Sequence, residues 1–164
     1  MKKGLLCALI VFLADQLSKT WVLSYFANHS SPVRVTPFFN FVLAWNKGVS
    51  FSMFHSNHPA MPWVFVTVSL LICAVILYWM SVEKNKATIC CFGLIVGGAL
   101  GNVLDRIRFK AVVDFLDFHI DTYHWPAFNV GDSAICIGAG AILIWNLFFA
   151  PTEKLSEPQK ENKQ

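Results

Sequence analysis

Four long stretches of apolar residues, nearly free of charged side chains, constrain this chain more than any other feature. They run over about residues 4–26, 61–80, 87–104 and 133–150. A helix needs about 20 mostly apolar residues to cross the hydrocarbon core of a bilayer. The stretches therefore predict an all-α membrane protein with four transmembrane helices.

The composition supports a membrane protein and disfavours several other classes. Only 14% of the 164 residues are charged, whereas charged residues make up about a quarter of an ordinary soluble domain. The net charge of +3 is small and scattered, so a nucleic-acid partner is not expected. The five cysteines include no CxxC pair and lie within apolar runs, which favours buried thiols over disulfides or metal ligands.

The first stretch could also be a secretory signal peptide. Asp15 and Lys19 interrupt its apolar run, and no small-residue cleavage site follows it. Both features are unlike a signal peptide. We therefore expect a retained helix that belongs to a single membrane domain over residues 1–150.

Four spans put both ends of the chain on the same side of the membrane. Lysines near the termini and in the loop around residue 84 outnumber the basic residues of the other two connections. This difference favours cytoplasmic termini under the positive-inside rule. Residues 151–164 then form a polar cytoplasmic tail, and the longer segments, about 27–60 and 106–132, lie on the outer face.

The first outer segment carries short apolar alternations. Within residues 33–45 they are bounded by Pro32, Pro37 and Gly48, which predicts a small β-sheet at the membrane surface. Residues 50–61 combine aromatics and histidines without a clean period. For them we expect an interfacial turn or a short amphipathic helix.

Asp15 and Lys19 are ionisable residues within the first predicted span. Such groups are costly in a bilayer unless they are paired or face water, so each is a candidate functional residue. Their spacing of four residues places them on one helix face. The sequence favours a structural salt bridge, with Lys19 extending outward toward the membrane surface.

The end of the third predicted span combines small and polar residues. Gly97, Gly98 and Gly101 would let another helix approach closely. The polar side chains that follow form one stripe at the outer boundary of the membrane, as either an ordinary charged helix end or a substrate-binding stripe. They are Asn102, Asp105 and Arg106.

Two aspartates lie near the outer edge of the membrane. Asp114 lies in an apolar run that could form a strand or a helical return, and Asp132 precedes the fourth span. Taken alone, Asn129 or Asp132 would best be interpreted as a helix cap, and Asp117 and Asp121 as solvated loop acids. Taken together, Asp114 and Asp132 suggest paired carboxylates that share one proton, activate water and need no metal.

Other chemistries lack their motifs. The chain has no GxSxG, no phosphate-binding glycine loop ending in Lys-Ser/Thr and no HExxH. Its histidines have no convincing zinc spacing. Lys19 could serve a serine nucleophile, but Asp15 is its better partner. We expect no cofactor.

Five motifs in order resemble those of the bacterial lipoprotein signal peptidases, also called the signal peptidase II family. The similarity extends over nearly the whole chain apart from the tail. The motifs are Asp15-Gln16-Leu17-Ser18-Lys19, Asn46-Lys47-Gly48-Val49-Ser50-Phe51, Gly98-Ala99-Leu100-Gly101-Asn102-Val103-Leu104-Asp105-Arg106, Val112-Val113-Asp114-Phe115 and Phe128-Asn129-Val130-Gly131-Asp132.

The resemblance implies an aspartyl endopeptidase of the bacterial inner membrane, with its active site near the periplasmic face. It would remove signal peptides on the amino side of a diacylglyceryl-modified cysteine, so its partners would be prolipoproteins and membrane lipids. The family's four-helix bundle with an extracytoplasmic β-cradle agrees with the predicted spans. Because the sequence shows no oligomer signal beyond the third span's glycines, we expect a monomer.

The resemblance also assigns roles to individual residues. Asp114 and Asp132 would be the catalytic pair. The matching substrate-binding or supporting positions are Asn46, Gly48, Asn102, Arg106, Asn129, Asp15 and Lys19.

Two positions depart from the family pattern, which usually has alanine where this chain has Val49 and Gly131. Neither departure removes a chemical group, but Gly131 could loosen the backbone that positions Asp132. Two alternatives from other classes remain. A small transporter would use Asp15, Lys19, Asp105 and Arg106 as a polar pathway, and a non-catalytic assembly protein would use its aspartates only as helix caps.

Overall fold

The computed structural model describes residues 1–48 and 59–148. Four helices within these residues are long and apolar enough to cross a membrane, which confirms the four predicted spans. They are α1 (Lys2–Phe26), α2 (Met61–Val82), α3 (Lys86–Phe109) and α4 (Val130–Phe148). Val49, most of the segment 50–61 and the tail 151–164 lie outside the described residues.

Two helix boundaries differ from those expected from the sequence. Helix α3 continues five residues beyond position 104, because Asp105 is buried and paired and so does not end it. It ends where Lys110 adopts a left-handed conformation with φ of 60°. Helix α4 begins at Val130 rather than near residue 133, so Asp132 lies within its first turn.

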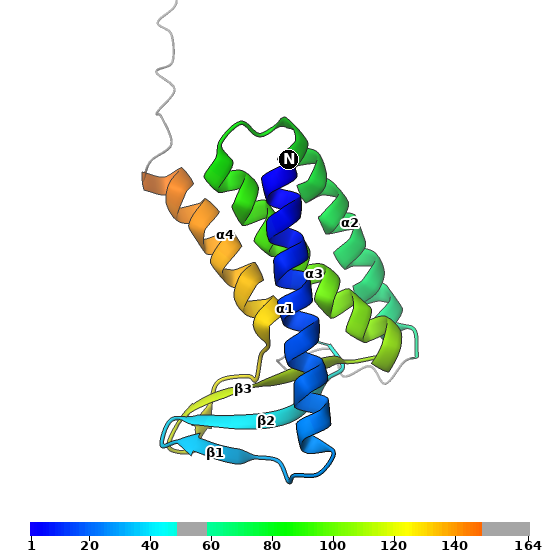
Figure 1. Cartoon of the computed structure of the whole chain (residues 1–164), viewed down its shortest axis with the longest axis vertical. Helices are drawn as coiled ribbons and strands as arrows, with labels where there is room; N and C mark the ends of the chain where they lie inside the picture. The colour runs from blue at the N-terminus through cyan, green and yellow to red at the C-terminus, as the bar shows by residue number, and fades with distance from the viewer. Residues whose placement is uncertain (49–58, 149–164) are drawn as a thin grey trace, which may run out of the picture.

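Helix α3 is the central helix and packs against α1, α2 and α4 (Figure 1). Its glycines allow these close approaches, as expected. A Cβ atom at Gly97 would collide with the backbone of Ala8 in α1, and one at Gly98 would collide with the backbone of Gly131 in α4. Small residues are needed at both crossings because the neighbouring backbones occupy the space that a side chain would fill.

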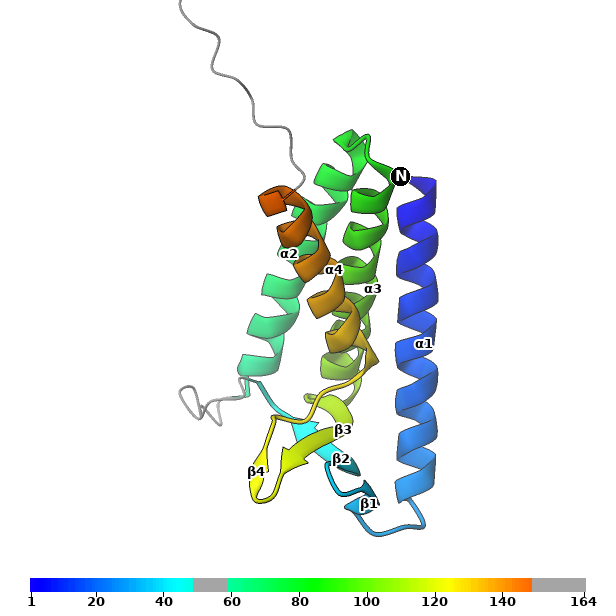
Figure 2. The ribbon, with the colours of Figure 1, turned by 90° about the vertical axis from the view of Figure 1, so that its left-hand side faces the viewer.

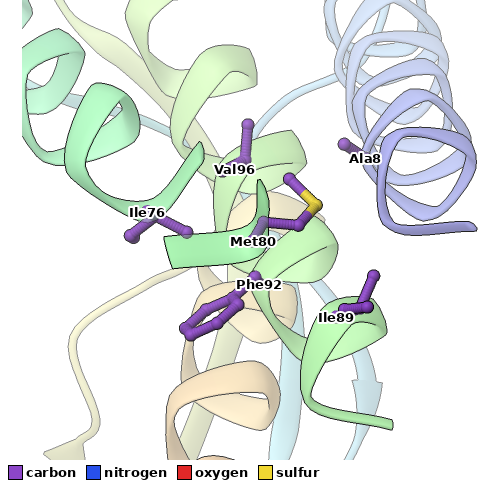
Figure 3. Close-up of a cluster of buried hydrophobic side chains, with 6 residues drawn as sticks. All are labelled: Ala8, Ile76, Met80, Ile89, Phe92 and Val96. Atoms are coloured by element: carbon purple, nitrogen blue, oxygen red, sulfur yellow. The ribbon is translucent and has the colours of Figure 1, made fainter. Parts of the chain in front are cut away.

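An apolar cluster fills the meeting point of α1, α2 and α3 (Figure 3). Because lipid tails are as apolar as these side chains, close packing rather than transfer from water stabilises such a cluster in a membrane. On the outside of the bundle, Leu17, Leu71 and Leu147 are exposed and suit contact with lipid. The buried residues of the cluster are Ala8, Ile76, Met80, Ile89, Phe92 and Val96.

A four-stranded antiparallel sheet lies at one end of the bundle. Its order is β1 (Val33–Thr36), β2 (Phe39–Asn46), β3 (Val112–Ile120) and β4 (Tyr123–His124). The first two strands confirm the sheet expected within residues 33–45. The segment around Asp114 is a strand and not a helical return, and Asp114 lies opposite Ala44 of β2.

A second apolar cluster joins this sheet to the bundle. Val22 of α1 packs with Val113 and Phe115 of β3, and all three are buried. Figure 2 shows the sheet at one end, with the N-terminus and the last turn of α4 at the other. The two ends of the described chain therefore lie at the same end of the bundle, in agreement with four spans.

The close contact between Gly97 of α3 and the backbone of α1 predicts the effect of adding a single methyl group at this position. Gly97→Ala should lower the thermal unfolding temperature in detergent, because the new Cβ would overlap the backbone of α1; overpacking of this kind costs about 1–3 kcal/mol. Gly140→Ala in α4 is the matched control, since its Cβ would meet no atom within 4 Å. An equal unfolding temperature for the two variants would contradict this packing.

Candidate active site

A buried ionic cluster centred on Lys19 lies in the bundle near the sheet. The Lys19 Nζ is 2.8 Å from the Asp15 carboxylate and 2.9 Å from the Asp105 carboxylate. The three side chains are only 2%, 0% and 1% exposed, respectively. The predicted Asp15–Lys19 ion pair is confirmed, but the expected outward extension of Lys19 is wrong. Asp105 and Asn102 hold its ammonium inside the protein.

The cluster ties three helices and a strand together. Asp15 of α1 accepts a hydrogen bond from the backbone N–H of Gly131 in α4 at 2.8 Å. Asp105 of α3 accepts one from the backbone N–H of Val113 in β3 at 3.1 Å. Gln16 donates to both carboxylates. Gly131 is therefore held by a specific hydrogen bond.

Asn102 connects the ionic cluster to Asp132. Its Oδ1 accepts a hydrogen bond from the Lys19 ammonium at 2.8 Å, and its Nδ2 donates to Asp132 Oδ1 at 2.8 Å. Because an ammonium can only donate, Lys19 fixes which end of the Asn102 amide faces Asp132. Asn102 is thus part of the site rather than an ordinary residue of a helix end.

Asp132 and Asn129 cap α4 reciprocally. The Asn129 side-chain oxygen accepts from the backbone N–H of Asp132 at 2.9 Å, while Asp132 Oδ2 accepts from the backbone N–H of Asn129 at 3.2 Å. This arrangement has the form of a capping box. The expectation of a cap is confirmed for Asn129. Asp132 instead lies within the first turn of α4 and completes the capping box, which fixes the direction of its carboxylate.

Asn129 also reaches the second aspartate. Its Nδ2 donates to Asp114 Oδ1 at 2.7 Å, and Asn46 Nδ2 donates to Asp114 Oδ2 at 3.0 Å. Asp114 is only 2% exposed. Burial, and then the nearby charge of Asp132, raise the pKa of Asp114 to about 6 even though both asparagines favour its ionised form.

Arg106 and Gly48 lie beside these polar groups. The Arg106 guanidinium donates to the backbone oxygen of Asn102, lies over the Phe65 ring and interacts electrostatically with both Asp114 and Asp132. Its buried Nε has no hydrogen-bond partner among the described residues. Gly48 donates its backbone N–H to Asn46 Oδ1 and has φ of 120°, a conformation that favours glycine.

Two cavities of about 400 Å³ each give access to the aspartates. Asp114 lines one cavity and Asp132 lines the other. Asn46 and the segment 124–127 line both. An extended polypeptide that occupied both cavities would therefore pass both carboxylates.

All the site residues proposed from the sequence belong to one connected region. Asp114 and Asp132 are linked through Asn129, Asn102 leads from Asp132 to the ionic cluster, and Asn46 leads from Asp114 to Gly48. No group of three or more His, Cys, Asp or Glu side chains within residues 1–48 and 59–148 is arranged to hold a metal ion.

Asp117 is a residue that the sequence interpretation placed wrongly. It is 7% exposed rather than a solvated loop acid, because it lies within β3 and accepts hydrogen bonds from Asn40 and His124. Gln16 was also missed as a partner of the buried carboxylates. Asp121 is exposed, as expected.

A chemical pattern follows from this geometry. Two carboxyl groups that differ in environment lie in one hydrogen-bonded network beside the two cavities. The raised pKa of Asp114 lets it hold a proton at a pH where an ordinary aspartate is ionised. Such a pair can combine general-base and general-acid catalysis.

Comparisons with known proteins agree with this pattern. A family model described as signal peptidase (SPase) II matches residues 7–149. The lipoprotein signal peptidase of Yersinia enterocolitica is 40% identical over 149 residues, which cover 90% of this chain and 87% of that protein. The lipoprotein signal peptidase of Shewanella sediminis is 40% identical over 155 residues, which cover 93% of this chain and 88% of that protein.

Solved structures of bacterial membrane enzymes have the same fold. One, 26% identical, superposes with a TM-score of 0.76 and covers 100% of this chain and 95% of its own. Another is 27% identical and also has a TM-score of 0.76. The match covers 92% of this chain and 96% of the solved one. With a family match over most of its length, the chain belongs to the signal peptidase II family of membrane peptidases.

Proposed function

We propose that this chain is a membrane aspartyl endopeptidase that removes signal peptides from prolipoproteins. Hydrolysis would occur on the amino side of the diacylglyceryl-modified cysteine, with Asp114 and Asp132 as the catalytic pair. The observation that carries the proposal is the hydrogen-bonded linkage of the two aspartates through Asn129, within a fold that belongs to this family.

The proposed reaction begins with Asp114 protonated and Asp132 ionised. Asp132 accepts a proton from water, which attacks the scissile carbonyl carbon, while Asp114 donates its proton to the carbonyl oxygen. The tetrahedral intermediate then breaks its C–N bond as Asp132 gives its proton to the leaving amine. Asp114 takes a proton back from a hydroxyl group of the intermediate as the new carboxyl group forms. The Asp132 carboxylate accepts hydrogen bonds from Asn102 Nδ2 and from the backbone N–H of Asn129, which hold it in place for this role.

The other site residues support this assignment in distinct ways. Arg106 supplies a positive charge beside both carboxylates. Its Nε, which has no hydrogen-bond partner within residues 1–48 and 59–148, is a donor for a substrate carbonyl. Asn46, which donates to Asp114, and Gly48, which donates to Asn46, would hold the substrate backbone. Asn102, Asn129, Asp15 and Lys19 orient the pair from within the bundle.

The proposed setting is the bacterial inner membrane, with both termini cytoplasmic and the sheet at the periplasmic face. The excess of basic residues near the termini supports this orientation. The domain would act as a monomer over residues 1–150, followed by a polar cytoplasmic tail. Its acylated substrate would enter laterally from the lipid, since the acyl chains of the cysteine are apolar.

The structure offers little support for the alternative of a transporter. A polar pathway needs charged groups that face water within the membrane. Instead, Lys19 forms ion pairs with both Asp15 and Asp105, and the three side chains are at most 2% exposed. A non-catalytic assembly role makes a different prediction, because helix capping should tolerate asparagine at position 132.

Replacing either carboxylate should abolish cleavage. We expect Asp114→Asn and Asp132→Asn each to reduce cleavage of a diacylglyceryl-modified prolipoprotein by about a thousandfold or more, because neither amide can exchange the required proton. Purified enzyme in detergent, followed by mass spectrometry of the products, measures this. A parallel reaction with a chelator should proceed at the normal rate.

Asp121→Asn is the matched control for these variants. Asp121 is exposed and has φ of 50°, a conformation that asparagine tolerates well. It should retain normal cleavage. Persistent cleavage by folded Asp114→Asn or Asp132→Asn enzyme would refute the aspartyl mechanism.

The pH dependence should report the protonation of the pair. Because the reaction needs a protonated Asp114 and its pKa is raised to about 6, kcat/KM should fall as the pH rises above about 6, with the slope of one proton. Asn46→Ala removes a hydrogen bond that favours ionised Asp114, so its midpoint should move to higher pH. A rate that rises steadily from pH 6 to pH 8 would contradict this assignment of the proton.

A further inference from the structure

A third carboxylate, that of Asp117, lies beside the catalytic pair and holds a histidine. Asp117 accepts hydrogen bonds from Asn40 Nδ2 at 2.9 Å and from His124 Nδ1 at 2.9 and 3.0 Å. Asp117 is buried, whereas the His124 side chain is 50% exposed. The catalytic mechanism above uses neither residue.

The carboxylate fixes how His124 presents its ring. Although burial opposes its ionisation, the hydrogen bonds from His124 and Asn40 hold the pKa of Asp117 below its usual value. An ionised carboxylate can only accept, so Nδ1 of His124 carries a hydrogen. Nε2 then faces away from Asp117, and no hydrogen-bond partner is found for it among the described residues.

The ring is also held by its neighbours. His124 stacks on His119 with 4.8 Å between the ring centroids, and the two residues pair across β3 and β4. A half-exposed polar side chain fixed in this way loses little conformational freedom when it binds a ligand, and such preorganisation favours affinity.

His124 lines both cavities that lead to the catalytic aspartates. Asp114 and Asp117 line the first, and Asp132 lines the second. The sheet that carries His124 lies past the ends of α2, α3 and α4, beside the last turns of α1 (Figure 2). A bound signal peptide would lie beside the membrane-spanning helices. The substrate residues that reach β4 would then be those on the C-terminal side of the scissile bond.

We propose that His124 is a substrate-binding residue for the polypeptide that follows the lipid-modified cysteine, and that Asp117 is the residue that positions it. This inference rests on the proposed peptidase function. Nε2 would hydrogen-bond a backbone amide of the mature segment, with no requirement for a particular side chain. The contact lies on the opposite side of the scissile bond from the signal peptide.

Two substrates separate this role from a structural one. Both are diacylglyceryl-modified prolipoprotein peptides with an amidated C-terminus. One ends at the modified cysteine, and the other continues for six further residues. The wild-type enzyme should have the lower KM for the longer peptide, because only that peptide reaches His124.

His124→Ala should raise KM for the longer peptide by about tenfold, the usual effect of losing one hydrogen bond. We expect kcat, and both constants for the shorter peptide, to stay unchanged. Asp117→Asn should have a similar but smaller effect, and His124→Gln should restore part of the preference because its amide can still form a hydrogen bond. His29→Ala is the control, since His29 is an exposed histidine that contacts Tyr25 of α1.

Equal changes for the two peptides, a change in kcat alone, or no change in His124→Ala would overturn this inference while leaving the peptidase function intact. If wild-type enzyme cleaves neither peptide, both proposals fail. Thermal unfolding of each variant identifies any loss of folding, and His124→Gln then provides the comparison if His124→Ala does not fold.

Discussion

The buried ammonium group of Lys19 is the interaction on which the rest of the structure depends. It lies between two carboxylates, Asp15 and Asp105, with no water-exposed surface to stabilise any of the three charges. Removing the ammonium would leave two buried carboxylates without a partner, and breaking a buried ion pair in this way costs about 3–5 kcal/mol. The cluster therefore restricts how α1 and α3 can be arranged.

The same cluster determines the position of the candidate catalytic groups. From Asp15 a hydrogen bond leads to the start of α4, and from Asp105 one leads to β3. Asp132 lies in the first of these elements and Asp114 in the second. Asn102 and Asn129 then complete the linkage, so a polar network inside the membrane bundle is coupled to a pair of carboxylates at its end.

Features that depend on local sequence could be predicted, whereas those that depend on distant partners could not. The four spans follow from runs of apolar residues, and the glycines of α3 are recognisable because small residues mark close helix packing. The end of α3 was misplaced because a charge normally ends a span. Asp105 can be buried because it pairs with Lys19 and accepts hydrogen bonds from Gln16 and from the backbone N–H of Val113. Asp117 was misplaced for a related reason, since its partner Asn40 lies 77 residues away in the chain.

In the candidate site, too, the residues could be predicted from the sequence but their contacts with distant partners could not. The spacing of residues suggested an aspartate pair, and the family resemblance supplied Asn46, Asn102, Arg106 and Asn129 as supporting residues. Neither source revealed that Asn129 contacts both aspartates or that Lys19 orients Asn102, because these contacts join different helices and a strand. The cap of α4 was foreseen, but its second use in directing the Asp132 carboxylate required the three-dimensional arrangement.

A variant that removes the charges of the cluster but preserves its shape tests most directly whether Lys19 positions the active site. Lys19→Met alone should lower both the unfolding temperature and the cleavage rate, because Asp15 and Asp105 are left unpaired. Adding Asp15→Asn and Asp105→Asn should restore much of the unfolding temperature, since no buried charge remains.

Cleavage of a diacylglyceryl-modified prolipoprotein by this triple variant is the decisive measurement. We expect a rate at least about tenfold below that of the wild type, because Asn102 has lost the charged donor that orients it toward Asp132. A folded triple variant that cleaves at the wild-type rate would contradict this expectation.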